Sequence, residues 1–166
     1  FEMPIMGSTQ SWDNAWDMLA MSNYNTITSL AESPVQEGIL YAGTDDGILQ
    51  VTEDGGQNWR QSVLPKVPAR SFINDVEASN HNANTVFAAA DAHKFGDYSP
   101  YLFMSSDQGN SWKSIVGDLP KNTIVWVIKQ DHIDENLLFI GTEYGIYFSP
   151  NKGVNWMILN ADVPTI

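Results

Sequence analysis

The chain has 166 residues, of which 43% are hydrophobic and 17% charged, and its 20 acidic side chains outweigh 8 basic ones to give a net charge of −12. A phosphate backbone or an anionic membrane surface would be repelled, so nucleic acid is excluded as a partner. No apolar stretch reaches the ~20 residues of a membrane-spanning helix, so no membrane insertion is expected, and the absence of cysteine excludes disulfides and thiolate metal sites.

The first segment, residues 1–24, is expected to be an N-terminal extension. Trp12, Trp16 and Leu19 recur at helical spacing after Ser11, which is placed as an N-cap, and this pattern predicts a short amphipathic helix. Such a helix either packs on the face of a sheet or offers an apolar stripe to a partner. The chain starts at Phe1 with no signal peptide, which suggests a piece of a longer protein.

A short motif of the form Ser/Thr-x-Asp-x-Gly-x-x-Trp, here called the turn motif, occurs three times between apolar runs of strand type. Its copies are about 50 residues apart, and a self-similar unit of that length with four strands predicts a β-propeller blade. The fold expected is therefore all-β. The defining positions are Thr52, Asp54, Gly56 and Trp59, then Ser105, Asp107, Gly109 and Trp112, then Ser149, Asn151, Gly153 and Trp156, where Asn151 departs from the pattern.

The residue types of the turn motif suit a structural role. A short carboxylate or amide accepts the backbone N–H groups that a tight hairpin leaves unpaired, and the leading hydroxyl does the same. The glycine adopts a backbone angle that a Cβ would forbid. The tryptophan then lays a large apolar ring over the hairpin. We therefore expect the Asp and Asn side chains to be occupied by their own turns.

In chain order, residues 25–166 are expected to form three four-stranded blades, at about 25–64, 71–116 and 123–159. In the second blade a ten-residue loop, 91–100, is predicted between the second and third strands. A closed propeller has typically ~4–8 blades, so three blades cannot close a ring. The segment is thus either part of a larger propeller or closed by association of copies into six blades, and a homo-oligomer is expected if it is isolated.

The alternation of strand direction places the second-to-third connections on the propeller face that is opposite to the turn motifs. A glycosidase needs two carboxylates there, although Asp and Glu beside Gly also have an ordinary role in turns. Asp91, His93, Asp97 and Tyr98 suggest a cation or sugar site, or else a loop that caps its own backbone. Calcium binding by paired carboxylates is a further alternative, although the sequence contains no twelve-residue calcium-binding loop. The candidate ligand-binding residues are Asp45, Asp46, Asp91, His93, Asp97, Tyr98, Glu143 and Tyr144.

The turn motifs resemble the Asp-box, or bacterial neuraminidase repeat, of sialidases, xyloglucan-cleaving glucanases and the sortilin ectodomain. A longer resemblance covers nearly the whole chain and includes residues 3–7, 21–34, 43–47, 100–103 and 141–147. These stretches are similar to the large sortilin-like repeat proteins of bacteria, which are often labelled glycosyl hydrolases. The resemblance implies N-terminal propellers and a secreted, periplasmic or cell-surface location.

These observations favour a non-catalytic propeller segment that binds a carbohydrate or a protein, or serves as a scaffold. An alternative is a fragment of a glycoside hydrolase, similar to sialidases or xyloglucanases, whose active site is shared with absent blades. A third reading is a protein-binding receptor module of sortilin type. The turn motif does not separate them, because it occurs in enzymes and receptors alike.

Overall fold

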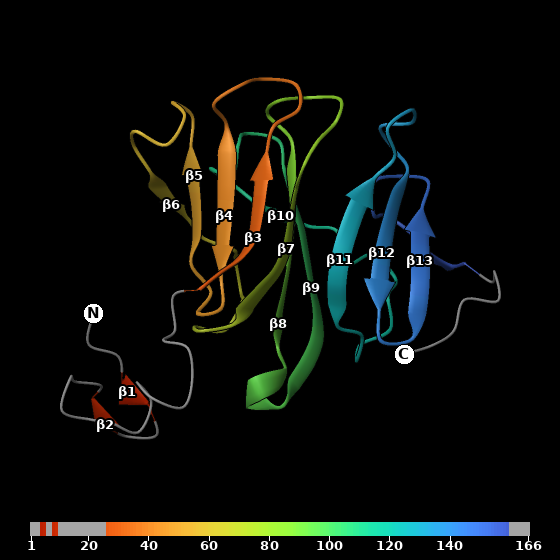
Figure 1. The fold of residues 1–166 in the computed structure, drawn as a ribbon. Helices are drawn as coiled ribbons and strands as arrows, with labels where there is room; N and C mark the ends of the chain where they lie inside the picture. The colour runs from red at the N-terminus through yellow and green to blue at the C-terminus, as the bar shows by residue number, and fades with distance from the viewer. Residues whose placement is uncertain (1–3, 6–7, 10–25, 160–166) are drawn as a thin grey trace.

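The computed structural model describes residues 4–5, 8–9 and 26–159. Over these residues the chain forms three separate four-stranded antiparallel sheets that stand side by side in an open row (Figure 1). Two short strands, β1 (Pro4–Ile5) and β2 (Ser8–Thr9), pair with each other ahead of the sheets. The predicted helix at residues 11–19 lies outside the described residues.

Each sheet is an up-and-down meander in which every strand pairs with the next one along the chain. Blade one contains β3 (Ile27–Glu32), β4 (Leu40–Thr44), β5 (Leu49–Thr52) and β6 (Arg60–Ser62). Blade two contains β7 (Phe72–Ala78), β8 (Val86–Ala92), β9 (Asp97–Ser105) and β10 (Lys113–Ser114). Blade three contains β11 (Val125–Gln130), β12 (Leu138–Thr142), β13 (Gly145–Ser149) and β14 (Met157–Ile158). The sequence prediction of an all-β propeller segment is confirmed.

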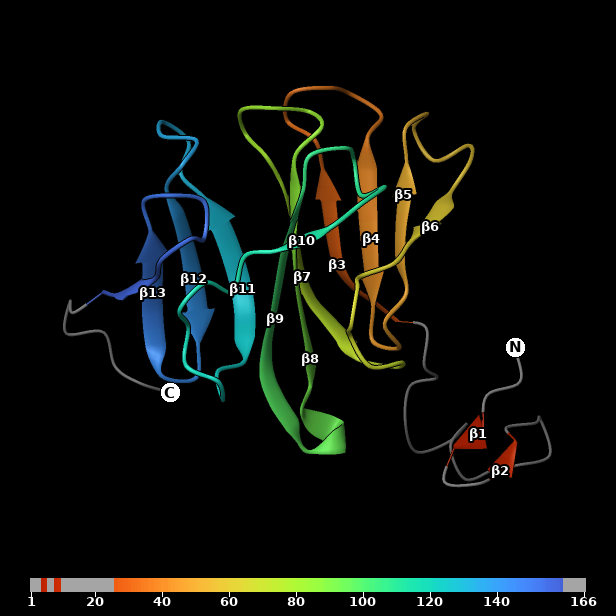
Figure 2. The same ribbon diagram turned by 180° about the vertical axis from the view of Figure 1, so that it is seen from behind.

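One predicted connection is wrong. The ten-residue loop at 91–100 is for the most part strand, because β8 continues to Ala92 and β9 begins at Asp97. Only the 3-10 turn η1 (His93–Phe95) and Gly96, at φ 76°, reverse the chain. The resulting hairpin extends beyond the ends of the neighbouring sheets (Figures 1 and 2). The chain thus reverses within four residues, 93–96, where ten had been predicted.

The inner strands β3, β7 and β11 share a bulge at the same place. The register shifts between Ile27 and Ser29, between Ile73 and Asp75, and between Val125 and Val127. This shared irregularity aligns the three blades residue by residue, so that Ser29, Asp75 and Val127 are equivalent positions.

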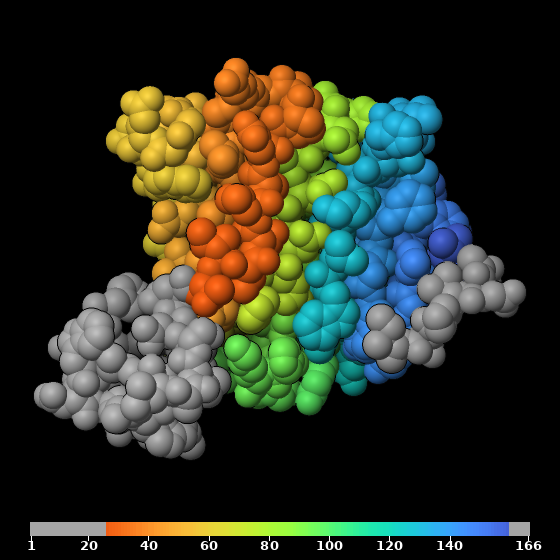
Figure 3. All heavy atoms as spheres, viewed as in Figure 1, coloured from red at the N-terminus to blue at the C-terminus, as the bar shows by residue number. Residues whose placement is uncertain are grey.

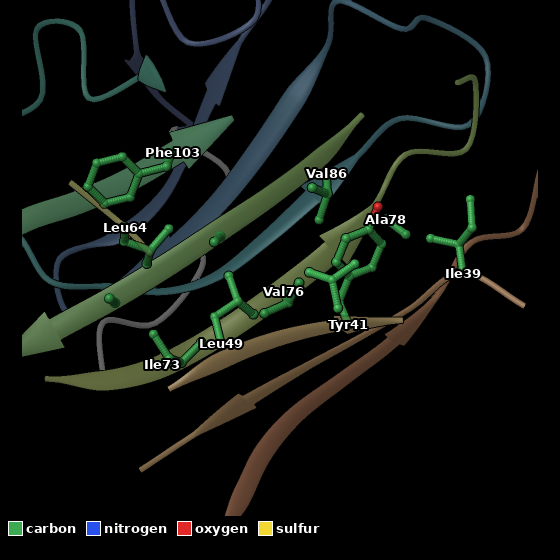
Figure 4. Packing of buried hydrophobic residues seen from close by; sticks show 12 residues of the cluster. Ile39, Tyr41, Leu49, Leu64, Ile73, Val76, Ala78, Val86 and Phe103 are labelled. Carbon is green, nitrogen blue, oxygen red and sulfur yellow. The ribbon is translucent and has the colours of Figure 1, made fainter. Parts of the chain in front are cut away.

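The hydrophobic core consists of two layers, one on each side of blade two. The first layer lies between blades one and two and includes Tyr41, Leu49, Val76 and Phe103 (Figure 4). The second lies between blades two and three and is built around Phe87, which is fully buried. The alternation of side chains along a strand sends successive residues of β8 into opposite layers, which explains why all seven residues of β8 are buried.

Polar contacts join the inner strands across both blade boundaries. The Ser29 hydroxyl donates to Asp75 Oδ1 at 3.2 Å and accepts the backbone N–H of Val76 at 2.9 Å. Asp75 in turn accepts the backbone N–H of Ile128 through Oδ2 at 3.0 Å. Ser29 and Asp75, which occupy the same position in blades one and two, thus each fix the distance from their blade to the next one.

The connections fall on two opposite faces. The turn motifs and the first-to-second connections lie at the upper ends of the sheets in Figure 1, and the second-to-third connections lie at the lower ends. The lower face is therefore the one on which sequence analysis collected the candidate ligand-binding residues. In the described part of the chain, no helix has the length and apolar character to cross a bilayer.

Candidate functional site

The turn motifs share one hydrogen-bond pattern. In blade two the Ser105 hydroxyl donates to Asp107 Oδ1 at 2.7 Å and accepts the Gly109 backbone N–H at 2.8 Å. Asp107 also accepts the Ser111 backbone N–H at 2.8 Å and the Ser111 hydroxyl at 2.6 Å. Thr52 with Asp54 repeats this arrangement in blade one. The hydroxyl and carboxylate groups of these turn motifs are therefore occupied by hydrogen bonds within their own turns, and none is left for catalysis.

Asn151 makes the same turn with an amide. Its Oδ1 accepts the Ser149 hydroxyl at 2.9 Å and the Asn155 backbone N–H at 3.0 Å, while its Nδ2 donates to Asn155 Oδ1 at 3.2 Å. The departure from the motif therefore costs no hydrogen bond. It removes only the negative charge.

The two carboxylates of the turn motifs are strongly acidic. The Asn58 backbone N–H lowers the pKa of Asp54 to about 2, with help from the side chains of Asn58 and Thr52. The Ser111 hydroxyl, with the backbone N–H of Ser111, lowers the pKa of Asp107 to about 2. Since both pKa values lie below the ordinary value of 3.8 for an aspartate, each carboxylate stabilises the fold above about pH 4 and loses this contribution as the pH falls toward 2.

Asn151→Asp and Asp107→Asn are expected to change acid unfolding in opposite directions. Asn151→Asp adds a third carboxylate of this kind, so the midpoint of urea unfolding should fall more steeply between pH 4 and pH 2 than in the parent chain. Asp107→Asn removes one, and the slope should become shallower. Urea titrations at pH 7, 4 and 3 measure both. Identical pH profiles for the two variants would contradict the assignment.

The tryptophans of the second and third turn motifs bind the preceding blade. Trp112 donates its indole N–H to Ser62 Oγ at 2.8 Å, and Trp156 donates to the backbone carbonyl of Ile115 at 2.9 Å. The Asp118 carboxylate, which follows blade two, accepts the backbone N–H of Trp156 at 2.6 Å, and this bond lowers the pKa of Asp118. The tryptophan of a motif thus secures a blade boundary in addition to covering its own hairpin.

Most carboxylates of the lower face are occupied by nearby polar groups. Asp45 Oδ1 accepts the Thr26 backbone N–H at 3.0 Å, and Asp46 accepts the Thr44 hydroxyl. Both oxygens of Glu143 accept the backbone N–H of Ile124, at 3.1 and 2.9 Å. The bonds of Asp45 and Glu143 tie the second-to-third turns of blades one and three to the residues just before their inner strands.

Asp97 is held by β9 itself. Its Oδ2 accepts the Tyr101 hydroxyl at 2.6 Å and its Oδ1 accepts the Ser99 backbone N–H at 2.9 Å. The hydroxyl of Tyr101 is the main cause of the lowered pKa of Asp97. The neighbouring Tyr98 is exposed, as is Tyr144 on blade three.

Asp91 and His93 form a pair of side chains at the boundary between blades two and three. Asp91 is 1% exposed. Its Oδ1 accepts a hydrogen bond from the backbone N–H of His93 at 3.0 Å and also pairs with Nδ1 of the His93 imidazole. The imidazole packs edge-on against Trp126 of blade three, with ring centroids 5.9 Å apart and planes at 63°. The Asp91 carboxylate therefore orients an imidazole that spans the boundary between two blades.

Three buried polar atoms near this pair have no hydrogen-bond partner: Asp91 Oδ2, Asn74 Oδ1 and Thr123 Oγ1. Phe72, two residues before Asn74, pairs with Asp91 across β7 and β8, and the Asn74 amide donates to the Val125 carbonyl at 2.8 Å. Asn74 and Asp91 thus lie on the adjacent strands β7 and β8, and Thr123 lies two residues before β11. A buried polar atom without a partner costs free energy.

Sequence analysis found Asp91 and His93 but missed Trp126, Asn74 and Thr123. The signal for Trp126 was its place two residues before the apolar Ile128 on an inner strand, where the bulge turns a large ring outward. Figure 3 shows the hairpin of blade two, in green, beside the cyan inner strand of blade three on the lower part of the molecule. Among the described residues, no group of three or more His, Asp or Glu side chains could hold a metal ion.

No family model matches the sequence, and no curated protein does, but solved structures match its fold. An ancestral GH74 enzyme superposes with a TM-score of 0.65 at 22% identity over 84% of this chain and 19% of that chain. The GH74 xyloglucanase from Xanthomonas campestris gives 0.63 at 13% identity over 84% and 24%. YCF48 bound to a D1 peptide gives 0.60 at 22% identity over 80% and 39%.

At these identities the likeness shows the fold. The chain spans a fifth to two fifths of the length of these three solved chains. The fold of the chain is thus similar to part of a β-propeller, and such propellers occur in GH74 enzymes as well as in a protein solved with a bound peptide.

Proposed function

We propose that the chain is a non-catalytic binding segment of a β-propeller, which takes a glycan or a peptide on the lower face at Asp91, His93 and Trp126. One observation carries the proposal: Asp91 is the one carboxylate of the described chain with a buried oxygen that lacks a hydrogen-bond partner. The other carboxylates that sequence analysis placed on this face accept hydrogen bonds from nearby backbone or side-chain groups.

The chemistry of these residues suits recognition. Trp126 exposes 42% of its surface and offers an apolar ring to a sugar or an aromatic side chain. His93, oriented by Asp91, offers a ring nitrogen beside it. The His93 side chain is 39% exposed, so the ligand is expected to contact the Trp126 ring and to hydrogen-bond the His93 imidazole.

Trp126→Ala should weaken ligand binding at least about tenfold, because a central aromatic contact is lost. Glycan and peptide arrays identify the ligand, and calorimetry of the chosen ligand with each variant gives the affinity. Ile133→Ser is the matched control, since Ile133 is 81% exposed after the opposite end of β11. Equal affinities for Trp126→Ala and the parent chain would contradict the site.

The second candidate function is a share in a glycoside hydrolase, which the likeness to GH74 enzymes favours. Glycosidases pair two carboxylates roughly 5–10 Å apart, and Asp91 supplies at most one of them in this segment. This function would be favoured if the chain releases reducing sugar from xyloglucan and if Asp91→Asn abolishes that release. Binding without turnover would favour the first.

A further inference from the structure

The contacts of the Asp91–His93 pair decide which nitrogen of the imidazole carries the proton. Asp91 Oδ1 accepts the backbone N–H of His93 at 3.0 Å, so this oxygen acts as an acceptor. The same oxygen pairs with Nδ1 of the imidazole, and Nδ1 is therefore the nitrogen that donates. Because only one nitrogen of a neutral imidazole carries a proton, Nε2 of His93 is left with a lone pair.

Nε2 of His93 is open to a ligand. The side chain is partly exposed, no residue of the described ranges hydrogen-bonds Nε2, and Nε2 is not one of the buried polar atoms that lack a partner. The hairpin that carries His93 belongs to blade two, which stands between the other two sheets (Figures 1 and 2). Access to this nitrogen therefore does not depend on the outer faces of blades one and three.

His81 shows the opposite arrangement on the upper face. Its Nε2 lies 2.8 Å from the backbone carbonyl of Asp131, and a carbonyl oxygen can only accept a hydrogen bond. His81 therefore carries a proton on Nε2, whereas His93 carries it on Nδ1. The two histidines should give opposite signatures in one spectrum, so His81 serves as an internal reference.

Asp91 is the one charged side chain of the described residues that is bonded to the imidazole. Each other carboxylate on the elements packed around it pairs with a group other than His93. The Lys94 ammonium lies 5.2 Å from the centre of the Phe72 ring, and blade three presents the uncharged ring of Trp126. The further titratable or charged groups on these elements are Asp75 and Glu77 on β7, Lys94 in η1, Asp97, Tyr98 and Tyr101 on β9, and Lys129 on β11.

A sugar ring suits the pair formed by His93 and Trp126. The planes of the two rings meet at 63° with centroids 5.9 Å apart, so an acceptor stands at the margin of a flat apolar ring. A pyranose stacks its C–H face on an aromatic ring while its hydroxyls point outward from the rim. The backbone N–H of a peptide is not attached to a stacking face in this way.

We propose that Asp91 is a positioning residue that fixes His93 as the Nδ1–H tautomer, so that Nε2 accepts a hydroxyl of an uncharged sugar at neutral pH. The proposal rests on the proposed function of this face and names the ligand class within it. A carboxylate has no proton to donate and would meet the lone pair of Nε2. Acidic sugars are therefore rejected at neutral pH.

Protonation of His93 reverses the polarity of Nε2. An imidazolium donates from both nitrogens, and its Nδ1 stays bonded to Asp91. A carboxylate then gains a donor, while a sugar hydroxyl, which both donates and accepts, pairs with either form of the ring. The site should thus discriminate against acidic sugars at neutral pH and discriminate less once His93 is protonated.

Long-range proton–nitrogen NMR of the histidine side chains tests the tautomer in the free chain. At about pH 7.5 a neutral His93 should show an unprotonated Nε2, and His81 a protonated one. Asp91→Asn should remove this preference at His93, because an amide side chain both accepts and donates. A protonated Nε2 on neutral His93 in the parent chain would overturn the proposal, whether or not a ligand binds.

An array that pairs neutral oligosaccharides with their uronic-acid counterparts tests the selection. At about pH 7.5 the parent chain should bind the neutral members at least about tenfold more tightly, and this ratio should fall severalfold at about pH 5. His93→Phe, which keeps an aromatic ring without its nitrogens, should make the ratio independent of pH. His132→Phe is the matched control, since His132 is exposed on the upper face, and it should behave like the parent chain. Circular dichroism verifies that each variant is folded.

The outcomes separate this proposal from the proposed function. Equal affinity for neutral and uronic-acid members at about pH 7.5, or a preference for peptides over sugars, would overturn the proposal and leave binding at this face intact. If the Nδ1–H tautomer is present but neither sugars nor peptides bind, the proposed function is contradicted, and the selection falls with it.

Discussion

Gly153→Ala is expected to lower the free energy of unfolding by about 3 kcal/mol, through overpacking and a side chain at positive φ. The new Cβ would overlap the Cβ and the carbonyl oxygen of Ile115, both 2.7 Å away, and would force blade three away from blade two. Urea unfolding monitored by tryptophan fluorescence measures the change.

Gly56→Ala is the matched control. Gly56 has φ 90° and Gly153 has φ 81°, so both substitutions pay the same conformational cost of about 1 kcal/mol. Gly56 has no neighbouring blade within 4 Å of the added Cβ, and only that cost should remain when the chain is measured as a monomer. Equal losses of stability for the two variants would show that the turn-motif glycine does not act at a blade boundary.

Phe87→Ala should lower the free energy of unfolding by about 3–5 kcal/mol, the range for emptying a buried aromatic site. Phe87 is fully buried on β8 and packs in the layer between blades two and three. The loss should appear in urea unfolding as a lower midpoint with an unchanged slope.

Phe95→Ala serves as the comparison, because Phe95 lies in η1 of the same blade and is 59% exposed. Its removal should change the free energy of unfolding by no more than about 0.5 kcal/mol. A small effect at Phe87, equal to that at Phe95, would contradict the packing of blades two and three.

Strand order and position could be predicted from the sequence because the turn motif repeats and the strands between its copies are apolar. Each blade's strands lie within the bounds expected for that blade, as Phe72–Ala78 does within 71–116. The outer strands begin one residue after each tryptophan, at Arg60, Lys113 and Met157. Regular strand pairing therefore starts only after the turn motif ends, in blade one as well as in blades two and three.

The candidate site could be predicted only in part. Asp91 and His93 stand two residues apart, so a local pattern revealed them, and the bond between them is local as well. Trp126 contacts His93 from 33 residues away along the chain (126 − 93), and Asn74 and Thr123 lie 17 and 32 residues from Asp91 (91 − 74 and 123 − 91). The spacing of residues within one strand does not reveal such contacts between blades, since they depend on the register of the inner-strand bulges.

Hydrogen exchange of the indole N–H groups, followed by NMR, tests the central claim that the tryptophans of the second and third turn motifs, Trp112 and Trp156, secure their blades to the preceding ones. Trp112 and Trp156 donate across blade boundaries, whereas Trp126 is 42% exposed and serves as the reference. The indole protons of Trp112 and Trp156 should exchange at least about a hundredfold more slowly than that of Trp126, and Ser62→Ala should accelerate Trp112 alone. Exchange of all three indoles at one rate, unaffected by Ser62→Ala, would contradict the account.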